Sequence, residues 1–344
     1  MTTTLSPSPS PSPGPGAIAT RPPTSRPGLL PAWLPPTAGA VALAAAAAAA
    51  AAVALPWLVN GYVIALAATG LVMAVLAMSA QLLVGLAGLP PLGQAAYLAV
   101  GAYTAATIAT LTNLGPIQLL AATAGGAVAA AVTGLLAVRT RGTTFLMVTF
   151  GLGELLHAAA NAWAPGGSEG VHVTPVVALP GLPAMVRPGW VYLYVLAGAL
   201  LIGVGVAVLV RTRFALLLRG IAAHEPRMRA DGHHTGRLLL AAYVIAGGIA
   251  GAAGALLIAV TRYVSPADAA MGVSALALAA ALIGSGSMTG ACTGAILLVV
   301  ARDWVGGLLG GHGPTLLGLA FLLLAYLPRH RLAGLTIRFP RRRT

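Results

Sequence analysis

The chain has 344 residues, of which 58% are hydrophobic and only 7% are charged, and its mean hydropathy is +0.91. Soluble globular domains carry about 25% charged residues, so this composition excludes an ordinary soluble domain and indicates a polytopic membrane protein. The net charge of +13 comes from 19 basic residues, all of them arginine. Basic loops on the cytoplasmic side of a membrane explain this charge better than nucleic-acid binding does.

The missing lysine and the single cysteine limit the chemistry of the chain. A phosphate-binding G-x-x-x-x-G-K-[ST] motif needs a lysine, so we expect no ATP site and no bound cofactor in this chain. The lone Cys292 excludes an intramolecular disulfide and a cysteine-based metal cluster. No set of side chains has the spacing of a catalytic or metal site, and we expect no enzyme activity.

A Pro/Ser-rich stretch, residues 1–37, opens the chain and is typical of a disordered tail. About ten apolar segments follow, and in lipid they must be helices because every backbone polar group has to be satisfied internally. They lie at about 38–56, 62–86, 92–112, 116–138, 143–163, 190–210, 238–260, 272–286, 290–308 and 313–328. The prediction is an all-α polytopic membrane protein, with a transmembrane domain over 38–328 and a basic tail over 329–344.

The arginines predict the orientation of these spans. If the N-terminus is inside, 16 of the 19 arginines lie on the cytoplasmic side, and only Arg187, Arg262 and Arg302 lie at the outer side. This agrees with the enrichment of basic residues in cytoplasmic loops. We therefore expect a multi-pass protein of the cell (inner or plasma) membrane with both termini in the cytoplasm.

Two segments rich in glycine and small residues interrupt the apolar pattern, one in each half of the chain. They predict broken or short helices near 85–112 and 284–300. Paired interruptions of this kind occur around the binding sites of transporters, whereas small residues alone also serve close helix packing. Both interpretations remain open.

Ionisable side chains occur at two places inside the apolar segments. Glu154 and His157 are three residues apart and so share one helix face. Such intramembrane groups suggest function, here either a proton relay or an interhelical hydrogen bond that fixes packing. Arg302 and Asp303 are adjacent, so they cannot face each other on a helix, and they indicate an anchor at the outer interface.

The stretch "TRFALLLRGIAAHEPRMRADGHHTGR", residues 212–237, is a polar island between two apolar spans. It contains five arginines, three histidines and two acids. Pro226 should break a helix there, and Gly232 can end its second piece. The stretch therefore predicts a charged helical elbow on the cytoplasmic side, which also carries the apolar side chains of Phe214, Leu216, Leu217, Leu218 and Ile221.

Five motifs in order resemble the branched-chain amino acid ABC transporter permease family, over about residues 85–300. They are "GLPPLGQAAYLAVGAYTAA", "RGTTFLMVTFGLGELLHAAANAW", "PGGSEGV", the elbow, and "RYVSPADAAMGVSALALAAALIGSGSMTGACTGAILLVV". The chain departs from the family pattern at the Pro-Pro of 90–91, where Leu-Ser is typical. It also departs at Ala223 and His224, where acidic or amide residues are typical. These departures leave the transported solute open among branched-chain amino acids, other amino acids, urea and amides.

The resemblance implies the permease subunit of an ABC importer, with ATP hydrolysed by separate subunits. The implied translocation path includes Gly93, Gln94, Tyr97 and Tyr103. The implied coupling residues are Arg219, Glu225 and Gly232. The resemblance also implies that the apolar side chains of the elbow dock into a groove of the ATPase subunit.

The same resemblance implies a set of partners. These are a second homologous permease subunit, two ABC ATPase subunits and an extracytoplasmic substrate-binding protein, for which Glu169 and Asp268 are the predicted contacts. Two other hypotheses stay open: an ion-coupled secondary transporter that uses Glu154 and His157, and a non-transporting membrane scaffold whose elbow recruits a partner.

Overall fold

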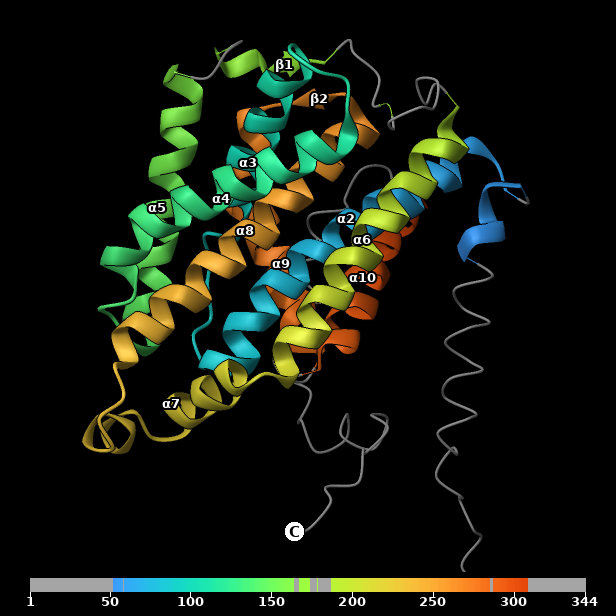
Figure 1. The fold of residues 1–344 in the computed structure, drawn as a ribbon. Coiled ribbons are helices and arrows are strands. Elements are labelled where there is room, and N and C mark those ends of the chain that lie inside the picture. The colour runs from blue at the N-terminus through green and yellow to red at the C-terminus, as the bar shows by residue number, and fades with distance from the viewer. Residues whose placement is uncertain are drawn as a thin grey trace, which may run out of the picture. The chain divides into compact units, whose positions relative to one another are not determined.

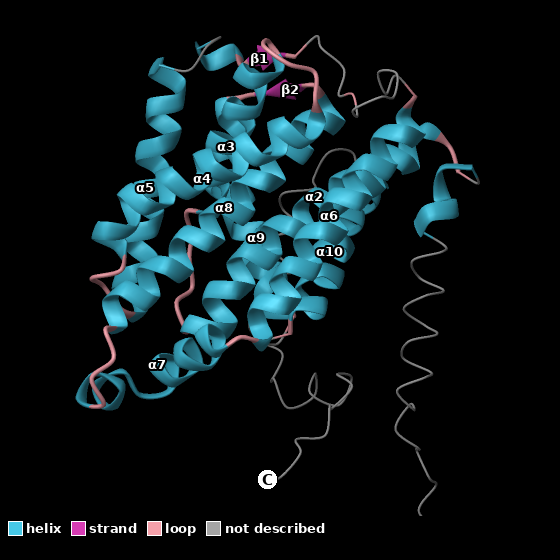
Figure 2. Ribbon diagram, in the orientation of Figure 1, coloured by secondary structure: helices cyan, strands magenta, loops and turns pink. Residues whose placement is uncertain are grey.

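The computed structural model describes residues 52–57, 59–163, 167–173, 178, 187–284 and 287–308. The two predicted tails, the predicted span 313–328 and most of the predicted span 38–56 lie outside these residues. In the described part the predicted all-α fold is confirmed, since helices dominate (Figure 2).

In the described part of the chain, ten helical elements form the main body and four short elements lie in the connections. The helical elements are α2 (Gly61–Leu82), the π-helical turn η1 (Leu83–Ala87), α3 (Gln94–Ala109), α4 (Gly115–Ala137), α5 (Gly142–Trp163), α6 (Pro188–Arg211), α7 (Arg213–Ala230), α8 (Thr235–Thr261), α9 (Met271–Ile283) and α10 (Met288–Leu308). The short elements are η2 (Gly167–Glu169), β1 (Val171–His172), β2 (Tyr263–Val264) and η3 (Pro266–Ala269).

Six segments of the described chain are long and apolar enough to cross a membrane, so the predicted number of about ten is high. They are Gly61–Ala87, Gly115–Ala137, Gly142–Ala162, Pro188–Arg211, Thr235–Thr261 and Pro266–Ile283. The predicted spans 92–112 and 290–308 form the helices α3 and α10, which are not among the six. With 16 residues, α3 is about 24 Å long, shorter than the roughly 30 Å hydrocarbon core.

The two glycine-rich interruptions have different structures. The first is a break in the helical path at residues 88–93, between η1 and α3, and it begins at Gly88 with a φ of 68°. The second lies between the 13-residue helix α9 and α10. There Gly284 packs so closely on the backbone of Gly290 and Ala291 that a β-carbon would overlap with it.

Helix α8 lies at the centre of the helical packing, against α3 and α4 (Figure 1). Three of its glycines make this close approach possible. A β-carbon on Gly251 would overlap with the carbonyl oxygen of Ala122 in α4, and one on Gly254 with that of Leu98 in α3. The third glycine of α8 is Gly247, and a β-carbon on Gly126 of α4 would come within 2.5 Å of its carbonyl oxygen. Small residues at an interface between spans allow backbones to pack this tightly.

The loops at one end of the bundle are joined by a two-stranded sheet, and α7 lies at the opposite end (Figure 1). Strands β1 and β2 pair antiparallel, with Val171 opposite Val264 and His172 opposite Tyr263. The sheet ties the loop after α5 to the loop after α8.

We expect Gly251→Ala to destabilise the fold by about 1–3 kcal/mol, because the added methyl group meets backbone atoms that cannot move without shifting α4. Thermal unfolding of the purified protein in detergent measures this change.

Gly236→Ala is the matched control, since Gly236 lies in the same helix and has no atom within 4 Å of its missing β-carbon. Equal unfolding temperatures for the two variants would show that the α4–α8 contact does not limit stability.

Candidate functional site

Helix α7 is an elbow made of two helical pieces. They meet at His224, whose φ of −158° and ψ of 83° are not helical, and Pro226 follows in the first turn of the second piece, where proline is well tolerated. Beyond the kink the chain turns back, so that the sulfur of Met228 would lie 3.0 Å from a β-carbon on Gly220. The elbow is therefore a bent structure, as the sequence predicted.

Gly232 ends the second piece, also as predicted. Its φ is 82°, in the left-handed region that favours glycine. The Gly232 amide donates to the carbonyl of Arg229 at 3.0 Å, and the His233 amide donates to that of Met228 at 3.1 Å. This pair of bonds is the Schellman arrangement, which satisfies the free carbonyls at a helix end.

The inner face of the elbow packs on the membrane domain. Leu218 and Ile221 are buried with Ala215 in the core cluster that α2, η1 and α8 also form. The prediction that Leu218 and Ile221 face a partner's groove is therefore wrong, because the helical repeat turns this side of α7 inward. Leu216, with 61% of its surface exposed, remains outward-facing.

Glu225 is the centre of a network that holds the elbow. Its carboxylate accepts two hydrogen bonds from Arg141, at 2.7 Å from Nε and 2.8 Å from Nη2. Arg229 donates to the same carboxylate at 2.7 Å, and the Thr235 hydroxyl donates at 3.1 Å. Arg141 precedes α5 and Thr235 begins α8, so one side chain links three parts of the chain.

The charge of Glu225 is fixed by these partners. The pKa of Glu225 is lowered from 4.5 to about 2, mainly by the hydrogen bonds from Arg141. The positive charge of Arg141 and the hydrogen bonds from Arg229 and Thr235 lower it further, whereas burial opposes the shift. Bidentate arginine–carboxylate pairs are among the stronger and more directional contacts in proteins. At neutral pH the carboxylate is ionised and the network is intact.

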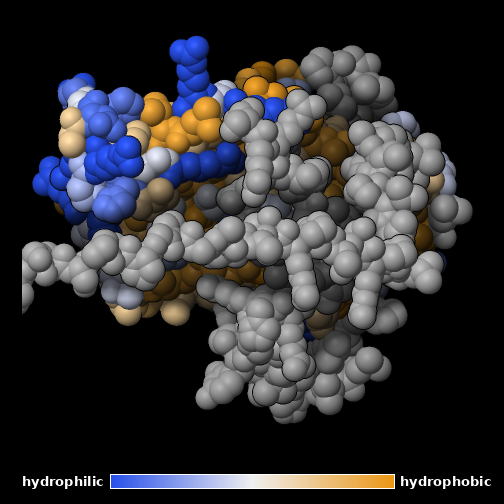
Figure 3. All heavy atoms as spheres, turned by 90° about the horizontal axis from the view of Figure 1, so that it is seen from below, coloured by the Kyte–Doolittle hydropathy of each residue, from blue (hydrophilic) through white to orange (hydrophobic). Residues whose placement is uncertain are grey.

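Arg219, the third predicted coupling residue, lies elsewhere on the elbow. It is exposed, and within the described ranges it forms no hydrogen bond or ion pair. Seen from the elbow end, hydrophilic residues gather at one side of the molecule (Figure 3). Glu225 thus makes its contacts within the elbow and with the neighbouring helix ends, whereas Arg219 is exposed on the elbow's surface.

The start of α3 lies where the chain is broken, and its free amides are satisfied by neighbouring helices. The Leu92 amide donates to Thr149 Oγ1 of α5 at 3.1 Å, and the Ala95 amide donates to Ser274 Oγ of α9 at 2.9 Å. Gly93 lies between them, where a β-carbon would come within 2.7 Å of the Thr149 carbonyl oxygen. Glycine is needed here for close backbone contact between the break and α5.

Buried amide side chains surround this junction of α2 and α3. Gln94 is 1% exposed, and Ser79 donates a hydrogen bond to its Oε1 at 3.3 Å. Among the described residues, Gln94 Nε2 and both amide atoms of the fully buried Gln81 have no hydrogen-bond partner. An unpaired buried polar group costs about 1–3 kcal/mol. Sequence reasoning missed Ser79, Gln81 and Ser274, whose only signal was a polar residue within an apolar run.

Tyr97 and Tyr103, the other predicted path residues, lie further along α3. The Tyr97 hydroxyl shares hydrogen bonds with Tyr243 at 2.8 Å and with Thr133 at 2.6 Å, all three side chains being buried. Tyr103 has a buried hydroxyl without a partner among the described residues. The structure brings Gly93 and Gln94 together at the break, and places the two tyrosines at successive depths beyond it.

Glu154 and His157 are in contact on one face of α5, as their spacing predicted. The distance from His157 Nδ1 to Glu154 Oε2 is 3.5 Å, and 43% of the Glu154 side chain is exposed. No cluster of three or more potential metal ligands occurs in the part of the chain that the structure describes.

The two acids predicted to meet a binding protein lie near the β1–β2 end. Glu169 is exposed, and its carbonyl accepts a hydrogen bond from the Tyr263 hydroxyl. Asp268 uses its carboxylate within its own loop, where it accepts from the Ser265 amide at 2.9 Å.

The sequence model of one protein family, described as "Branched-chain amino acid transport system / permease component", matches residues 62–327. The chain belongs to this family. Membership confirms the resemblance of the five motifs, and with the six apolar helices it makes the chain a multi-pass membrane protein of the transport permease class. No solved structure matches the chain.

Two curated relatives share the family. The chain is 29% identical over 282 residues to the "High-affinity branched-chain amino acid transport system permease protein LivM" of Escherichia coli strain K12. It is 28% identical over 282 residues to the protein of the same description from Salmonella typhimurium strain LT2. Each match covers 73% of this chain and 65% of the relative, so the chain spans just under two thirds of the length of these relatives.

We expect Glu225→Gln to loosen the elbow while leaving its shape unchanged, because glutamine keeps the size of the side chain but lacks the charge that holds two arginines. Trypsin should then cleave the elbow after Arg227 and Arg229 severalfold faster in the detergent-solubilised protein, as followed by mass spectrometry of the fragments.

Asp231→Asn removes one negative charge from the same elbow and serves as the control. Its side chain makes no hydrogen bond or ion pair with the described residues. Equal cleavage rates for Glu225→Gln and the unsubstituted protein would contradict a holding role for Glu225.

Proposed function

We propose that the chain is the permease subunit of an ABC-type importer, and that it forms the translocation path for branched-chain or related amino acids. The observation that carries the proposal is the Glu225 network, which ties the elbow to the beginnings of α5 and α8. An elbow clamped in this way can pass a displacement on to the membrane helices. Family membership and the printed names of the two relatives support the amino-acid class.

The proposed coupling route runs through α5. Arg141 holds Glu225 at the elbow, and eight residues further on Thr149 accepts the hydrogen bond from the Leu92 amide at the helix break. A helix is stiff over this length, so a shift of Arg141 moves Thr149 with it. Gly93, packed on the same turn of α5, would follow.

The helix break is the proposed gate of the path. The N-terminal end of α3 is held by single hydrogen bonds to Thr149 and Ser274 rather than by a continuous helix, so it could separate from α5 and α9 with the loss of few hydrogen bonds. Gln94, whose amide nitrogen has no partner among the residues that the structure describes, would gain partners when the gate opens to water or solute. In this mechanism of alternating access, solute reaches Gln94 first from one side of the membrane and then from the other.

The partners follow from the same mechanism. The elbow would face the cytoplasm, together with both termini, in keeping with the positions of the arginines. Two ABC ATPase subunits would bind and hydrolyse ATP, one of them in contact with Arg219 and Leu216, and this chain would bind no cofactor and catalyse no reaction. A second homologous permease would complete the pore, and an extracytoplasmic binding protein would dock near Glu169.

An ion-coupled secondary transporter is the second candidate, and the contact between Glu154 and His157 favours it. A carboxylate and an imidazole in contact can exchange a proton. The Glu154 side chain is 43% exposed, and no other described acid contacts the pair. These features suit a contact within α5 better than a proton path.

Purification of the tagged chain from its source membrane in mild detergent tests the proposal. We expect ATPases with phosphate-binding loops and a second permease to co-purify, and the complex in proteoliposomes to take up leucine only with ATP and the binding protein. A chain that purifies alone and takes up solute with a proton gradient, in a manner abolished by Glu154→Gln, would establish the second candidate instead. A complex that transports no solute would support the third hypothesis, a non-transporting membrane scaffold.

Arg141→Gln should lower ATP-driven uptake by about tenfold or more while ATP hydrolysis continues, because the elbow loses its bidentate link to α5. The ratio of solute transported to ATP hydrolysed in proteoliposomes measures this uncoupling.

Arg139→Gln is the matched control, since Arg139 is exposed and forms no ion pair within the described residues. An unchanged transport ratio in Arg141→Gln would exclude the route through α5.

A further inference from the structure

A small cleft lies between α2, α9 and α10, away from the helix break and the elbow. It is lined by Thr69, Met73, Leu276, Ala277, Ala295, Leu298, Val299, Arg302 and Asp303. Most of the lining is apolar. The exceptions are one hydroxyl and two opposite charges, which come from adjacent residues of α10.

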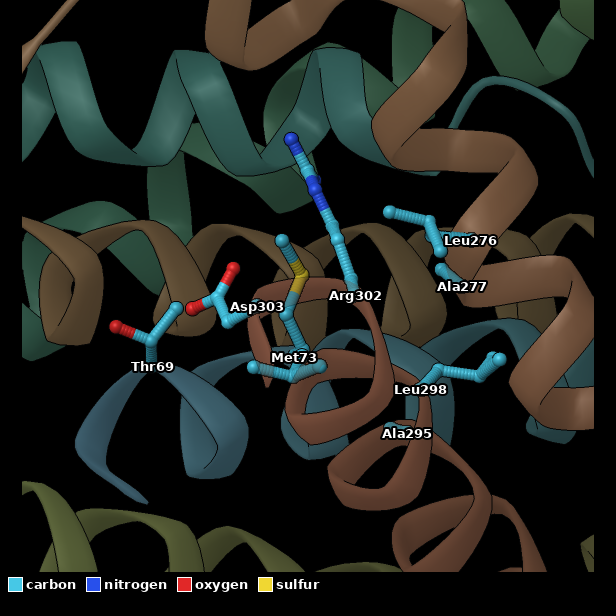
Figure 4. Close-up of a pocket in the computed structure, with 9 residues that line it drawn as sticks. Thr69, Met73, Leu276, Ala277, Ala295, Leu298, Arg302 and Asp303 are labelled. Atoms are coloured by element: carbon cyan, nitrogen blue, oxygen red, sulfur yellow. The ribbon is translucent and has the colours of Figure 1, made fainter. Parts of the chain in front are cut away.

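The two charged side chains lie on different sides of the cleft. Adjacent residues on an α-helix point about 100° apart, so Arg302 and Asp303 cannot pair face to face. Figure 4 shows Asp303 directed toward Thr69 and Arg302 extending another way, with Met73 between them in this view. Both side chains are exposed, and neither forms a hydrogen bond or ion pair with any other described residue.

Among the described residues, the two opposite charges beside this apolar wall have no partner. Charged groups in a membrane normally pair with each other or with a substrate. An anchor at the interface needs only one long cationic side chain that reaches the headgroups. That role does not explain a carboxylate beside it or the apolar wall below.

The geometry points to a binding site for one aliphatic α-amino acid zwitterion. Arg302 would bind the carboxylate, Asp303 would bind the ammonium group with help from the Thr69 hydroxyl, and Met73, Leu276 and Leu298 would hold the aliphatic side chain. A single anion would be repelled by Asp303, and a single cation by Arg302. At neutral pH an α-amino acid carries both charges, and its aliphatic part gains by leaving water.

This site deepens the proposed function and rests on it, since it supplies the solute recognition that the transport proposal leaves open. It differs from the path residues Gly93 and Gln94, which lie at the helix break. The helix α9 joins the two regions, because it provides Ser274 to the start of α3 and Leu276 and Ala277 to the cleft.

Equilibrium binding of radiolabelled L-leucine to the full-length chain with its co-purified partners, in lipid nanodiscs, tests the site without ATP. We expect saturable binding that falls about tenfold or more in Arg302→Gln and in Asp303→Asn, since each loses a charge-assisted contact. Arg187→Gln, which alters another exposed arginine outside the cleft, should bind as the unsubstituted protein does.

Two ligand analogues separate the roles of the charges. 4-Methylpentanoate lacks the ammonium group, so it should compete poorly with leucine on the unsubstituted protein and relatively better on Asp303→Asn. L-Leucinamide lacks the carboxylate, so it should compete poorly with leucine on the unsubstituted protein and relatively better on Arg302→Gln. Equal competition on all variants would overturn the assignment.

Three other outcomes would overturn the site. They are no saturable leucine binding by the unsubstituted complex, unchanged binding in both variants, and a phospholipid that co-purifies through Arg302 and is not displaced by leucine. ATP-driven uptake measured on the same preparations separates the two proposals. If both variants bind leucine normally and still take it up with ATP, the proposed binding site is refuted and the importer proposal stands. If uptake is absent but leucine binding depends on Arg302, the importer proposal is refuted and the binding site stands.

Discussion

The close contact of α8 with α3 and α4 is the constraint on which the other features depend. Between helices in lipid the hydrophobic effect contributes little, and association relies on packing and hydrogen bonds. The glycines at 247, 251 and 254 bring three backbones together, and this places Tyr97 and Tyr243 within hydrogen-bonding distance. Because α8 begins at Thr235, the same helix also carries one of the partners of Glu225. The packed core and the elbow are thus connected through α8.

A broken helix needs compensation that an intact helix does not. The amides at the start of α3 have no partners in their own helix, and within a membrane water cannot replace them. Thr149 and Ser274 fill this role from α5 and α9. These bonds are few, and both side-chain amide atoms of Gln81 and the Nε2 of Gln94 have no partner among the described residues. The junction is therefore held less firmly than the glycine-packed core beside it, which suits a segment that moves during transport.

Local patterns in the sequence predicted much of the fold, and long-range contacts could not be predicted. Apolar runs located the helices, and Gly232 marked the end of the elbow because only a local backbone conformation is needed there. The pairing of Glu225 with Arg141 joins residues 84 positions apart, which no local pattern encodes. Leu218 and Ile221 were assigned to the outside because an amphipathic helix presents its apolar face to a partner or to its own core, and the sequence does not distinguish the two. The cleft beside Arg302 needs three helices that only the folded chain brings together.

In the proposed mechanism, α9 explains why recognition and gating can be separate yet linked. Its first turn accepts the Ala95 amide through Ser274, and its next residues line the cleft. With only 13 residues, it is too short to bend appreciably, so a displacement at one position reaches the other. A solute that pulls α2, α9 and α10 together at the cleft would therefore alter the contact that holds the start of α3. By linkage, opening of the gate must change the affinity of the cleft by the same factor, and that reciprocity is what an importer needs to release its solute inward.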